Sequence, residues 1–291
     1  MRQRCTMEFL QLKYFCDAAE TENFSKTAKK YFVPTSNISQ SIKRLENELG
    51  CELFEHRANK ITLNSDGKRF YAEVSQALAL LDNEKKRLAD RDNNLCGDIR
   101  LICLNNRRTV AGAIEKFMEL YPNVNFIIHH NFDPEPDFDI IVSDNCPYEY
   151  SKKILLVDED IRIAMNKNHP LVNKASFSIA NLKHERFITM TAGSSLQKIT
   201  VSACEAAGFT PNIAIQTDVP FYVQKYVEMG LGIAFVPYHA WHGQFSDNIV
   251  LKKTDNIRRK TYAFLPKGKY IKRSVEAFLQ ILQSESEASL K

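Results

Sequence analysis

Small polar side chains that could form hydrogen bonds with the edges of bases occupy one side of residues 36–43. Apolar residues recur here at steps of four, three and four, at Ile38, Ile42, Leu45 and Leu49, which is the spacing of a helix with one buried face. The opposite face then presents Ser36, Asn37, Ser39, Gln40 and Lys43. Asparagine and glutamine can form paired hydrogen bonds with adenine, and serine reaches bases or phosphates. The pattern indicates a helix that reads nucleic acid, although a helical hairpin with an ordinary solvated face would show it too.

Positive charge surrounds this polar face. Residues 23–49 hold five basic and two acidic side chains, a balance of 5 − 2 = +3, and Lys26, Lys29 and Lys30 precede the polar helix. Lysine side chains are suited to contacts with phosphates. Such contacts contribute a binding affinity for nucleic acid that falls as the salt concentration rises. The charge therefore agrees with a nucleic-acid partner.

Two shorter helices and a hairpin are expected to position the polar helix. Apolar residues with helical spacing predict a first helix through residues 9–19, with Thr6 available as its N-cap. A second helix is expected to open at Ser25 and to carry Ala28, Tyr31 and Phe32, before Pro34 breaks it. Gly50 would end the third helix, and residues 51–63 would form a hairpin that turns at residues 58–60. Two helices, a short break and a polar third helix are typical of a helix-turn-helix.

A long helix is predicted over residues 65–92, because apolar residues there follow a seven-residue repeat. Val74, Leu81 and Leu88 are seven apart, and Phe70 and Leu78 fill alternate positions. The helix could pack on its own domain or pair with the same helix of a second copy. The polar residues around the seam favour pairing, so the predicted dimerisation residues are Phe70, Val74, Leu78, Leu81 and Leu88.

After Gly97 short strands alternate with helices, which is typical of an α/β domain. The expected strands are residues 99–102, 124–129, 138–142, 154–157, 161–165, 187–190, 213–216 and 233–236. The expected helices are residues 109–120, 196–207, 219–229 and 272–283. We expect the basic stretch at residues 252–273 to be a solvated lobe surface, with extra nonspecific DNA contact as the alternative.

Length and composition exclude several classes of protein. A chain of 291 residues with 44% hydrophobic residues and a net charge of 39 − 35 = +4 suits two globular domains. Seven cysteines without CxxC spacing argue against a disulfide framework and against a zinc ribbon. The sequence has no signal-peptide pattern, no membrane-length apolar run and no glycine-rich phosphate loop. We therefore expect a cytoplasmic protein without a cofactor or a bound metal, and without a membrane partner.

The residues at the N-terminus also carry a family resemblance. The matching stretches are Met7-Glu8-Phe9, Leu12, Phe15, residues 23–28, residues 38–46, Leu49-Gly50, residues 53–55 and Leu63. At this spacing the chain resembles the LysR-type transcriptional regulators, whose winged helix-turn-helix binds double-stranded DNA. Pro34-Thr35, Gln40 and His56 depart from the usual pattern, and Arg57 could take the role that the family gives to an arginine in the wing. The resemblance implies DNA contacts by Ser25, Lys26, Thr35, Ser36, Asn37, Ser39, Gln40, Lys43, His56 and Arg57.

The second half of the chain resembles the effector-binding domain of the same family. The similar segments are residues 117–122, 138–142, 169–171, 207–211 and 229–237. The resemblance implies two α/β lobes of the kind seen in periplasmic binding proteins, with a ligand cleft between them, and a homodimer or homotetramer. The expected divisions are a DNA-binding domain at residues 1–65, a linker helix at 66–94 and an effector domain at 95–285. Lobe I would span about 97–158 and 266–285, and lobe II about 159–265.

The effector cleft is expected where strands end and helices begin, because free N–H groups at helix N-termini favour anions. Arg107 and Arg108 lie in such a connection, so they could bind an anionic effector or could simply be exposed. The resemblance implies that the segment from Thr189 to Ser195 lies across the cleft from them. Pro134 and Pro136 stand where the family normally has a helix, so the first lobe is expected to be trimmed. The expected effector residues are Asn105, Asn106, Arg107, Arg108, Asn131, Thr191, Ser194, Ser195, Asp218 and Val219.

Other residues suggest alternative functions. Cys204 resembles one cysteine of the peroxide-sensing members, but Ser195 stands where the reactive partner would fall, so Cys204 is expected to be a buried small side chain. His129 and His130 are adjacent on a predicted strand and would point to opposite faces, which argues against chelation. An enzyme is disfavoured because the sequence has no GxSxG or HExxH motif, and because an enzyme would leave the polar helix unexplained. A solute-binding protein that does not bind DNA is a further alternative.

Overall fold

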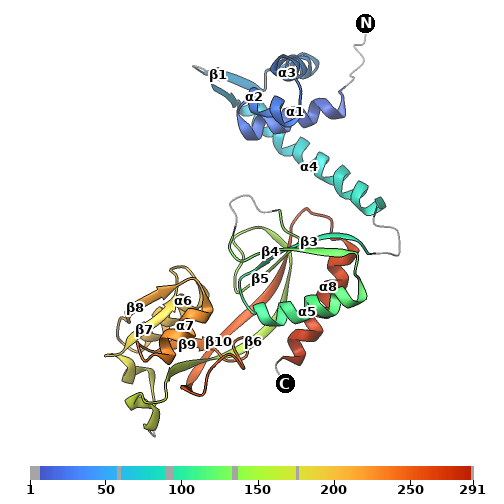
Figure 1. The fold of residues 1–291 in the computed structure, drawn as a ribbon. Coiled ribbons are helices and arrows are strands. Elements are labelled where there is room, and N and C mark those ends of the chain that lie inside the picture. The colour runs from blue at the N-terminus through green and yellow to red at the C-terminus, as the bar shows by residue number, and fades with distance from the viewer. Residues whose placement is uncertain (1–6, 58–59, 90–94, 133–136, 175–176, 290–291) are drawn as a thin grey trace. The chain divides into compact units, whose positions relative to one another are not determined.

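The computed structural model describes residues 7–57, 60–89, 95–132, 137–174 and 177–289. Contacts divide the chain into two compact units, an N-terminal unit that ends with the long helix α4 and a larger C-terminal unit. The N-terminal unit consists of α1 (Phe9–Thr21), α2 (Phe24–Lys30), α3 (Thr35–Leu49), β1 (Phe54–Arg57), β2 (Lys60–Leu63) and α4 (Ser65–Ala89) (Figure 1). This is the expected order of three helices, a hairpin and a long helix. The predicted hairpin turn lies largely outside the described residues.

The apolar stripe of α3 packs into the core of the N-terminal unit. Ile38 and Leu45 are fully buried there with Phe15 of α1, whose ring contacts that of Phe54 in β1 at 5.7 Å between centroids. Gly50 ends α3 in the left-handed conformation, with φ 73°, as its sequence position predicts. The buried stripe therefore fixes which face of α3 is left for solvent.

The start and end of α2 differ from the prediction. The helix is capped by Asn23, whose side chain accepts a hydrogen bond from the N–H of Lys26 at 3.0 Å, and Ser25 lies within its first turn. The helix ends at Lys30, and Phe32 adopts φ 55° with 96% of its surface exposed. The turn before Pro34 thus rotates Phe32 outward while Val33 packs on the core. For α1 the N-cap is Glu8, and Thr6 lies outside the described residues.

The two halves of the long helix α4 lie in different surroundings. One half packs on its own domain and the other is exposed. Phe70, Val74 and Leu78 pack against the core of the N-terminal unit, whereas Leu81 and Leu88 are exposed. The first half of the seven-residue repeat therefore stabilises the helix-turn-helix domain itself. Pairing with a second copy stays a prediction, now confined to the second half of the helix.

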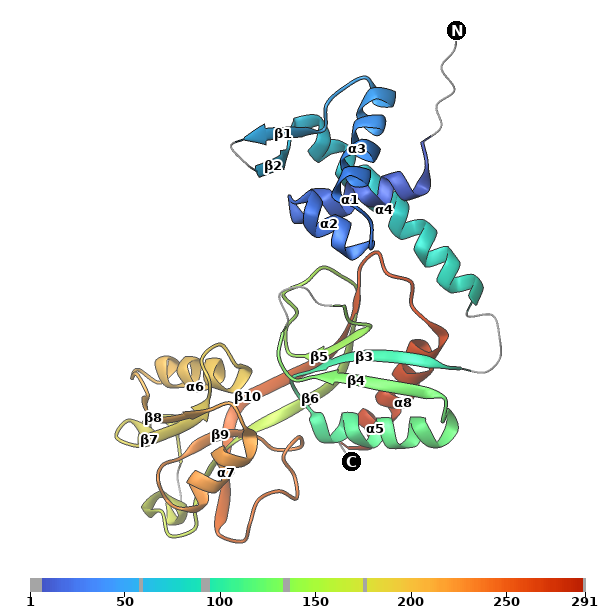
Figure 2. The same ribbon diagram turned by 45° about the horizontal axis from the view of Figure 1, so that its top comes forward.

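The C-terminal unit is built on a six-stranded sheet with the order β4-β3-β5-β10-β6-β9. Its strands are β3 (Gly97–Cys103), β4 (Val124–His129), β5 (Ile140–Ser143), β6 (Tyr150–Asn166), β9 (Ala234–Pro237) and β10 (Ile249–Pro266). In lobe I, α5 (Arg107–Leu120) and α8 (Arg273–Ala288) pack against one face of this sheet (Figure 2). Their shared core includes Phe117 and Phe278, whose rings contact edge to face.

Lobe II has its own core. It contains the two parallel strands β7 (Arg186–Met190) and β8 (Asn212–Thr217), the helices α6 (Ser195–Ala206) and α7 (Pro220–Glu228), and the short turns η1 (Pro170–Asn173) and η2 (Ile179–Leu182). Phe187 and Phe235 stack at its centre, and a bridge between Phe187 and Ile233 joins β7 to the segment that leads into β9.

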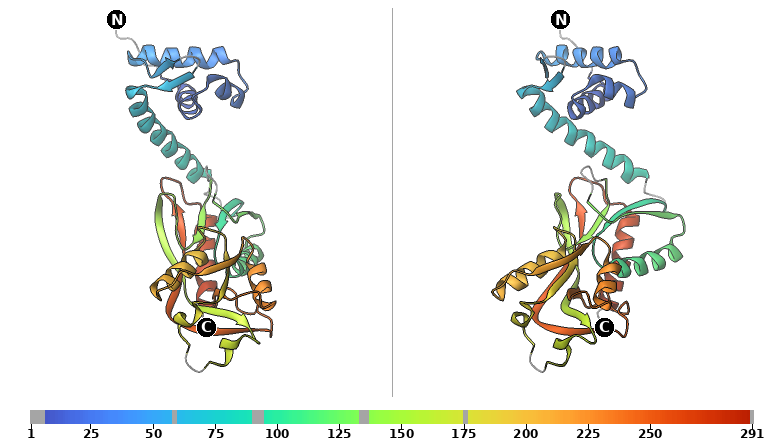
Figure 3. Two further views of the ribbon diagram at one scale, coloured as in Figure 1. Left: turned by 90° about the vertical axis from the view of Figure 1, so that its left-hand side faces the viewer. Right: turned by 60° about the vertical axis from the view of Figure 1, so that its left-hand side comes forward.

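Two long strands connect the lobes, and this is where the structure corrects the sequence analysis most clearly. Residues 154–157 and 161–165, predicted as two strands, belong to the single strand β6, and the basic stretch after residue 252 is mostly β10. The two strands pair antiparallel along most of their length, as Figure 3 shows. Arg258, Arg259 and Lys260 lie opposite Asp160, Glu159 and Asp158, so opposite charges neutralise each other across the strands. Arg259 is only 5% exposed, so the predicted solvated surface is wrong for this residue.

The loop after β4 follows the expectation of a trimmed lobe I. The described residues between His129 and Ile140 form no helix, and residues 133–136 lie outside the description. Among the described helices, none is both long enough and apolar enough to cross a membrane.

Candidate functional site

The polar face of α3 is exposed as the sequence predicts. Thr35, Ser36, Asn37, Gln40 and Lys43 are exposed on the face opposite Ile38, Ile42 and Leu45. Ser39 differs from the expectation, because it is half-buried and its hydroxyl donates to the carbonyl oxygen of Thr35 at 3.2 Å. Its side chain is therefore less free than its neighbours to bond a base.

Two hydrogen bonds fix α3 on the rest of the domain. The buried side-chain amide of Gln11 in α1 donates to the carbonyl oxygen of Ser41 at 3.0 Å. The carboxylate of Glu46 accepts from the N–H groups of Leu53 at 2.7 Å and Phe54 at 3.2 Å, at the start of the hairpin. The helix and the hairpin are thereby held in one arrangement, which is what a surface that reads a groove needs.

Gly67 allows α4 to lie close to the hairpin. A Cβ atom at this position would stand 2.1 Å from the carbonyl oxygen of Leu53 and 2.9 Å from the side chain of Leu63. Only glycine fits such an approach to backbone. The sequence analysis attached no role to this glycine, and a motif search alone does not reveal one.

The other predicted DNA contacts are placed less completely. Ser25 and Lys26 are exposed in the first turn of α2. His56 and Arg57 lie in β1, and their side chains are outside the description. Arg44 and Asn47 are also exposed on α3, four residues after Gln40 and Lys43. The helical step of four could have added both to the predicted contacts.

All ten predicted effector residues line one cleft of the C-terminal unit. The cleft has a volume of about 790 Å³. The N-termini of α5, α6 and α7 all border it, at Asn106–Arg108, Ser194–Leu196 and Val219–Pro220. Helix N-termini carry partial positive charge and unpaired N–H groups, so this arrangement favours an anion.

The two arginines on the lobe I side of the cleft have different surroundings. Both lie in the first turn of α5, rather than in a loop before the helix as predicted. Arg107 is half-buried, and its Nε has no hydrogen-bond partner within the described part of the chain. Arg108 donates to the carbonyl oxygen of His242 in lobe II at 2.5 Å, close to Gly243. Arg107 is thus the arginine with unused donor capacity, and Arg108 joins the two sides.

Two predicted residues already form hydrogen bonds with other side chains. The side chain of Asn105 donates to Asp144 at 3.1 Å, and the Oδ1 of Asn106 accepts from the hydroxyl of Thr261 at 2.8 Å. Asn106 precedes α5 in the left-handed conformation, with φ 51°. Both are nearly buried, so they shape the cleft more than they offer free groups to a ligand.

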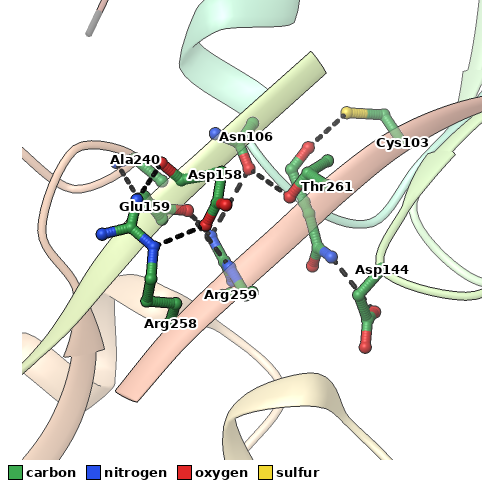
Figure 4. A network of polar contacts seen from close by, with 10 residues as sticks. Cys103, Asn106, Asp144, Asp158, Glu159, Ala240, Arg258, Arg259 and Thr261 are labelled. Carbon is green, nitrogen blue, oxygen red and sulfur yellow. Dashed lines mark hydrogen bonds and ion pairs between the residues drawn. The ribbon is translucent and has the colours of Figure 1, made fainter. Parts of the chain in front are cut away.

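Several further residues line the cleft without having been predicted, and the most consequential are Arg259 and Trp241. Arg259 bonds Glu159 through Nη2 at 2.6 Å and Nε at 3.1 Å, and both side chains are buried (Figure 4). Trp241 follows β9 and lines the lobe II side. In the sequence, Arg259 is one member of a basic stretch. It can be recognised as a cleft residue only once the pairing of β10 with β6 is known.

The charges along the cleft are three arginines against two aspartates. Arg107, Arg108 and Arg259 line it together with Asp144 and Asp218. Glu159 compensates the charge of Arg259 from behind. The free positive charge is therefore concentrated at the first turn of α5, opposite the hydroxyl groups of Thr191, Ser194 and Ser195 on α6 and the loop before it.

The burial of Cys204 disfavours the redox alternative. Cys204 is fully buried in α6, and burial raises the pKa of its thiol to about 11, so the reactive thiolate is scarce at neutral pH. Ser195 lies at the cleft and carries no thiol. His130 contacts the carbonyl oxygen of Cys103 through Nδ1 at 2.8 Å. Across the described residues, no group of three metal-binding side chains converges.

Comparisons with known proteins agree with both halves of the chain. Residues 9–68 match the bacterial regulatory helix-turn-helix protein of the lysR family, and residues 93–287 match the LysR substrate binding domain. The chain belongs to the LysR family of transcriptional regulators. It is 28% identical over 243 residues to the transcriptional dual regulator GltC of Bacillus subtilis, covering 79% of this chain and 81% of that protein.

Solved structures share the fold over nearly the whole chain. A full-length OxyR variant from Pseudomonas aeruginosa superposes with a TM-score of 0.62 at 18% identity, covering 97% of this chain and 95% of that one. Full-length CbnR, solved in complex with its target DNA, superposes with a TM-score of 0.54 at 18% identity and covers 96% of this chain and 100% of that one. The expected winged helix-turn-helix followed by an effector-binding α/β domain is therefore confirmed.

Proposed function

We propose that this protein is a LysR-type transcription factor that reads double-stranded DNA with α3 and responds to a small anionic effector in the cleft of its C-terminal unit. Residues 1–65 would bind DNA, 66–94 would link and dimerise, and 95–285 would bind the effector. Because its target is chromosomal DNA, the proposal assigns it to the cytoplasm. Its curated relatives are regulators, and the proposal includes no catalytic role.

One observation carries the DNA-binding half of the proposal. The exposed face of α3 bears Asn37, Gln40 and Lys43, and its other face is fully buried. The major groove admits one helix and presents each base pair as a distinct set of donors and acceptors. Short amide side chains on a helix with a fixed orientation can read such a set. Ser25, Lys26 and Arg57 would hold phosphates beside it.

The effector half rests on the first turn of α5. Arg107 offers a buried Nε without a partner among the described residues, beside the N-termini of two further helices. An anion placed there would gain a charge-assisted hydrogen bond without breaking an existing one. The apolar side chains of Phe132, Trp241 and Leu196 also line the cleft, so the effector is expected to carry an apolar part.

Selection from a random duplex pool tests the DNA-binding half. The full chain would be incubated with the pool and excess nonspecific competitor, and the retained DNA would be sequenced. We expect a pair of half-sites related by inverted repetition and spaced by whole turns of DNA, because a two-fold symmetric dimer presents two recognition helices. A retained pool with the same composition as the input would refute sequence-specific binding.

A further inference from the structure

We propose that the buried Glu159–Arg259 pair is a positioning element that joins the two sides of the cleft, so that a change at the start of α5 in lobe I alters the surroundings of Trp241 in lobe II. The inference rests on the proposed effector cleft but needs neither the effector nor DNA for its test.

A continuous series of hydrogen bonds crosses the base of the cleft. In lobe II, the N–H of Ala240 donates to Oε2 of Glu159 at 2.8 Å. The other oxygen of Glu159 accepts from Arg259. Arg259 then contacts Oδ1 of Asn106 through Nη2 at 3.4 Å (Figure 4). The series therefore runs from the segment after β9 to the residue that precedes α5.

The two ends of this series lie next to residues that line the cleft. Asn106 is followed by Arg107, and Ala240 is followed by Trp241, and all four residues line the cleft. Thr261 of β10 donates a further hydrogen bond to Asn106 at 2.8 Å. Movement of the first turn of α5 toward a bound anion would therefore displace Asn106. Because Asn106 contacts Arg259, this displacement would also shift the Glu159–Arg259 pair.

Burial distinguishes this pair from its neighbours on the same strands. The side chain of Glu159 is 0% exposed and that of Arg259 is 5% exposed, whereas Arg258 and its partner Asp160 are 49% and 47% exposed. A buried pair is held firmly because removal of one partner leaves an uncompensated charge away from water. Exposed pairs exchange with solvent and contribute little. Of these two pairs, the buried one is therefore the better held to transmit a displacement between the lobes.

Trp241 is the only tryptophan of the chain, so its fluorescence reports on the lobe II side alone. We would replace Asn106 with glycine, which keeps the left-handed backbone and removes the side chain, and measure acrylamide quenching of Trp241 in the full-length protein. We expect the quenching constant to change by about twofold, the effect of a weak coupling between members of one network. Asn105→Ala is the matched control, because its side chain bonds Asp144 within lobe I, and it should leave Trp241 unchanged.

Asn106→Gly is then introduced into a variant that lacks the Glu159–Arg259 ion pair. Glu159→Leu with Arg259→Met replaces the ion pair by apolar side chains of similar size, a substitution that folded proteins often tolerate. In this background Asn106→Gly should no longer affect Trp241. In a second background, Asp158→Asn with Arg258→Gln, the exposed pairs are lost and the effect should persist.

Two results would overturn the proposal. One is an unchanged Trp241 after Asn106→Gly in the native chain, and the other is an equal effect in the Leu/Met background. If that background does not melt cooperatively, Arg259→Lys replaces it, because lysine keeps a positive charge beside Glu159 but lacks the planar Nε and Nη2 donors through which Arg259 bonds Glu159 and Asn106. Failure of DNA selection would leave these measurements unaffected, so the two proposals can fail separately.

Discussion

Arg108 in the first turn of α5 donates a hydrogen bond to the carbonyl oxygen of His242 on the opposite side of the cleft, at 2.5 Å. The arginine before it, Arg107, leaves its Nε without a partner among the described residues. The two neighbours thus have separate tasks. We propose Arg107 as the arginine that meets an anionic ligand, whereas Arg108 connects the lobes.

The first prediction separates these two arginines. A small anion that raises the melting temperature of the full chain should lose this effect in Arg107→Ala, because the unpaired donor is gone. Arg108→Ala should lower the melting temperature of the free protein slightly but keep the response to the anion. Differential scanning fluorimetry with a panel of small carboxylates and phosphate esters measures both. A full response in Arg107→Ala would move the anion site elsewhere.

The second prediction concerns base and phosphate contacts on α3. Gln40→Ala should cost about 1–3 kcal/mol on the selected DNA and relax the preference at one base pair. Lys43→Ala should weaken binding to all DNA sequences alike. It should also reduce the slope of log affinity against log salt concentration by about 1, the value for one lost phosphate contact. Both side chains are exposed, so neither change should alter folding. Titrations of selected and scrambled duplexes across a salt series decide the matter. If Gln40→Ala discriminates between selected and scrambled duplexes as well as the native chain does, then Gln40 contacts no base that determines specificity.

The third prediction places the dimer contact on the second half of α4. Leu81 and Leu88 are 57% and 48% exposed there. Replacing both with aspartate should introduce unpaired charge into an apolar contact and lower the mass measured by light scattering. Leu120→Asp is the control, because this leucine is 64% exposed in another element. Dimerisation through α4 would be excluded by an unchanged mass in the double variant.

The fourth prediction tests the redox alternative through Cys204. Burial raises the pKa of its thiol from 9 to about 11, so the folded state keeps the proton that the unfolded chain releases. The contribution to stability is complete below pH 9 and is lost as the pH rises from 9 to 11. Peroxide at neutral pH should leave DNA binding unchanged, and Cys204→Ser should behave like the native chain. If peroxide releases DNA from the native chain but not from Cys204→Ser, the redox function would be supported instead.

The recognition helix could be predicted from the sequence because its determinants are local. The stripe of Ile38, Ile42 and Leu45 sets the buried face, and Gly50 sets the end. The cap of α2 was misplaced because Asn23 and Ser25 are both good caps, and only the backbone geometry decides between them. Ser39 was misjudged for a related reason, since its bond to Thr35 depends on its rotamer.

The ten cleft residues were predicted from the ends of strands and the starts of helices, together with the resemblance to the family, and the structure brings all ten to one cleft. The role of each was not accessible in this way. The sequence does not distinguish Arg107 from Arg108, because the partner of Arg108 is a backbone carbonyl 134 residues later in the chain.

By itself, the sequence determined the helix-turn-helix and the α/β character of the second half, because these depend on periodicity and on residues close together in the chain. It also predicted a set of residues that share one cleft. The tertiary structure alone decided that α4 is half core and half exposed, and that Arg259 is a buried partner of Glu159 rather than part of a solvated surface. Arg259 can be buried because a distant strand supplies Glu159 in register with it, and the pairing of strands 100 residues apart is a property of the folded chain.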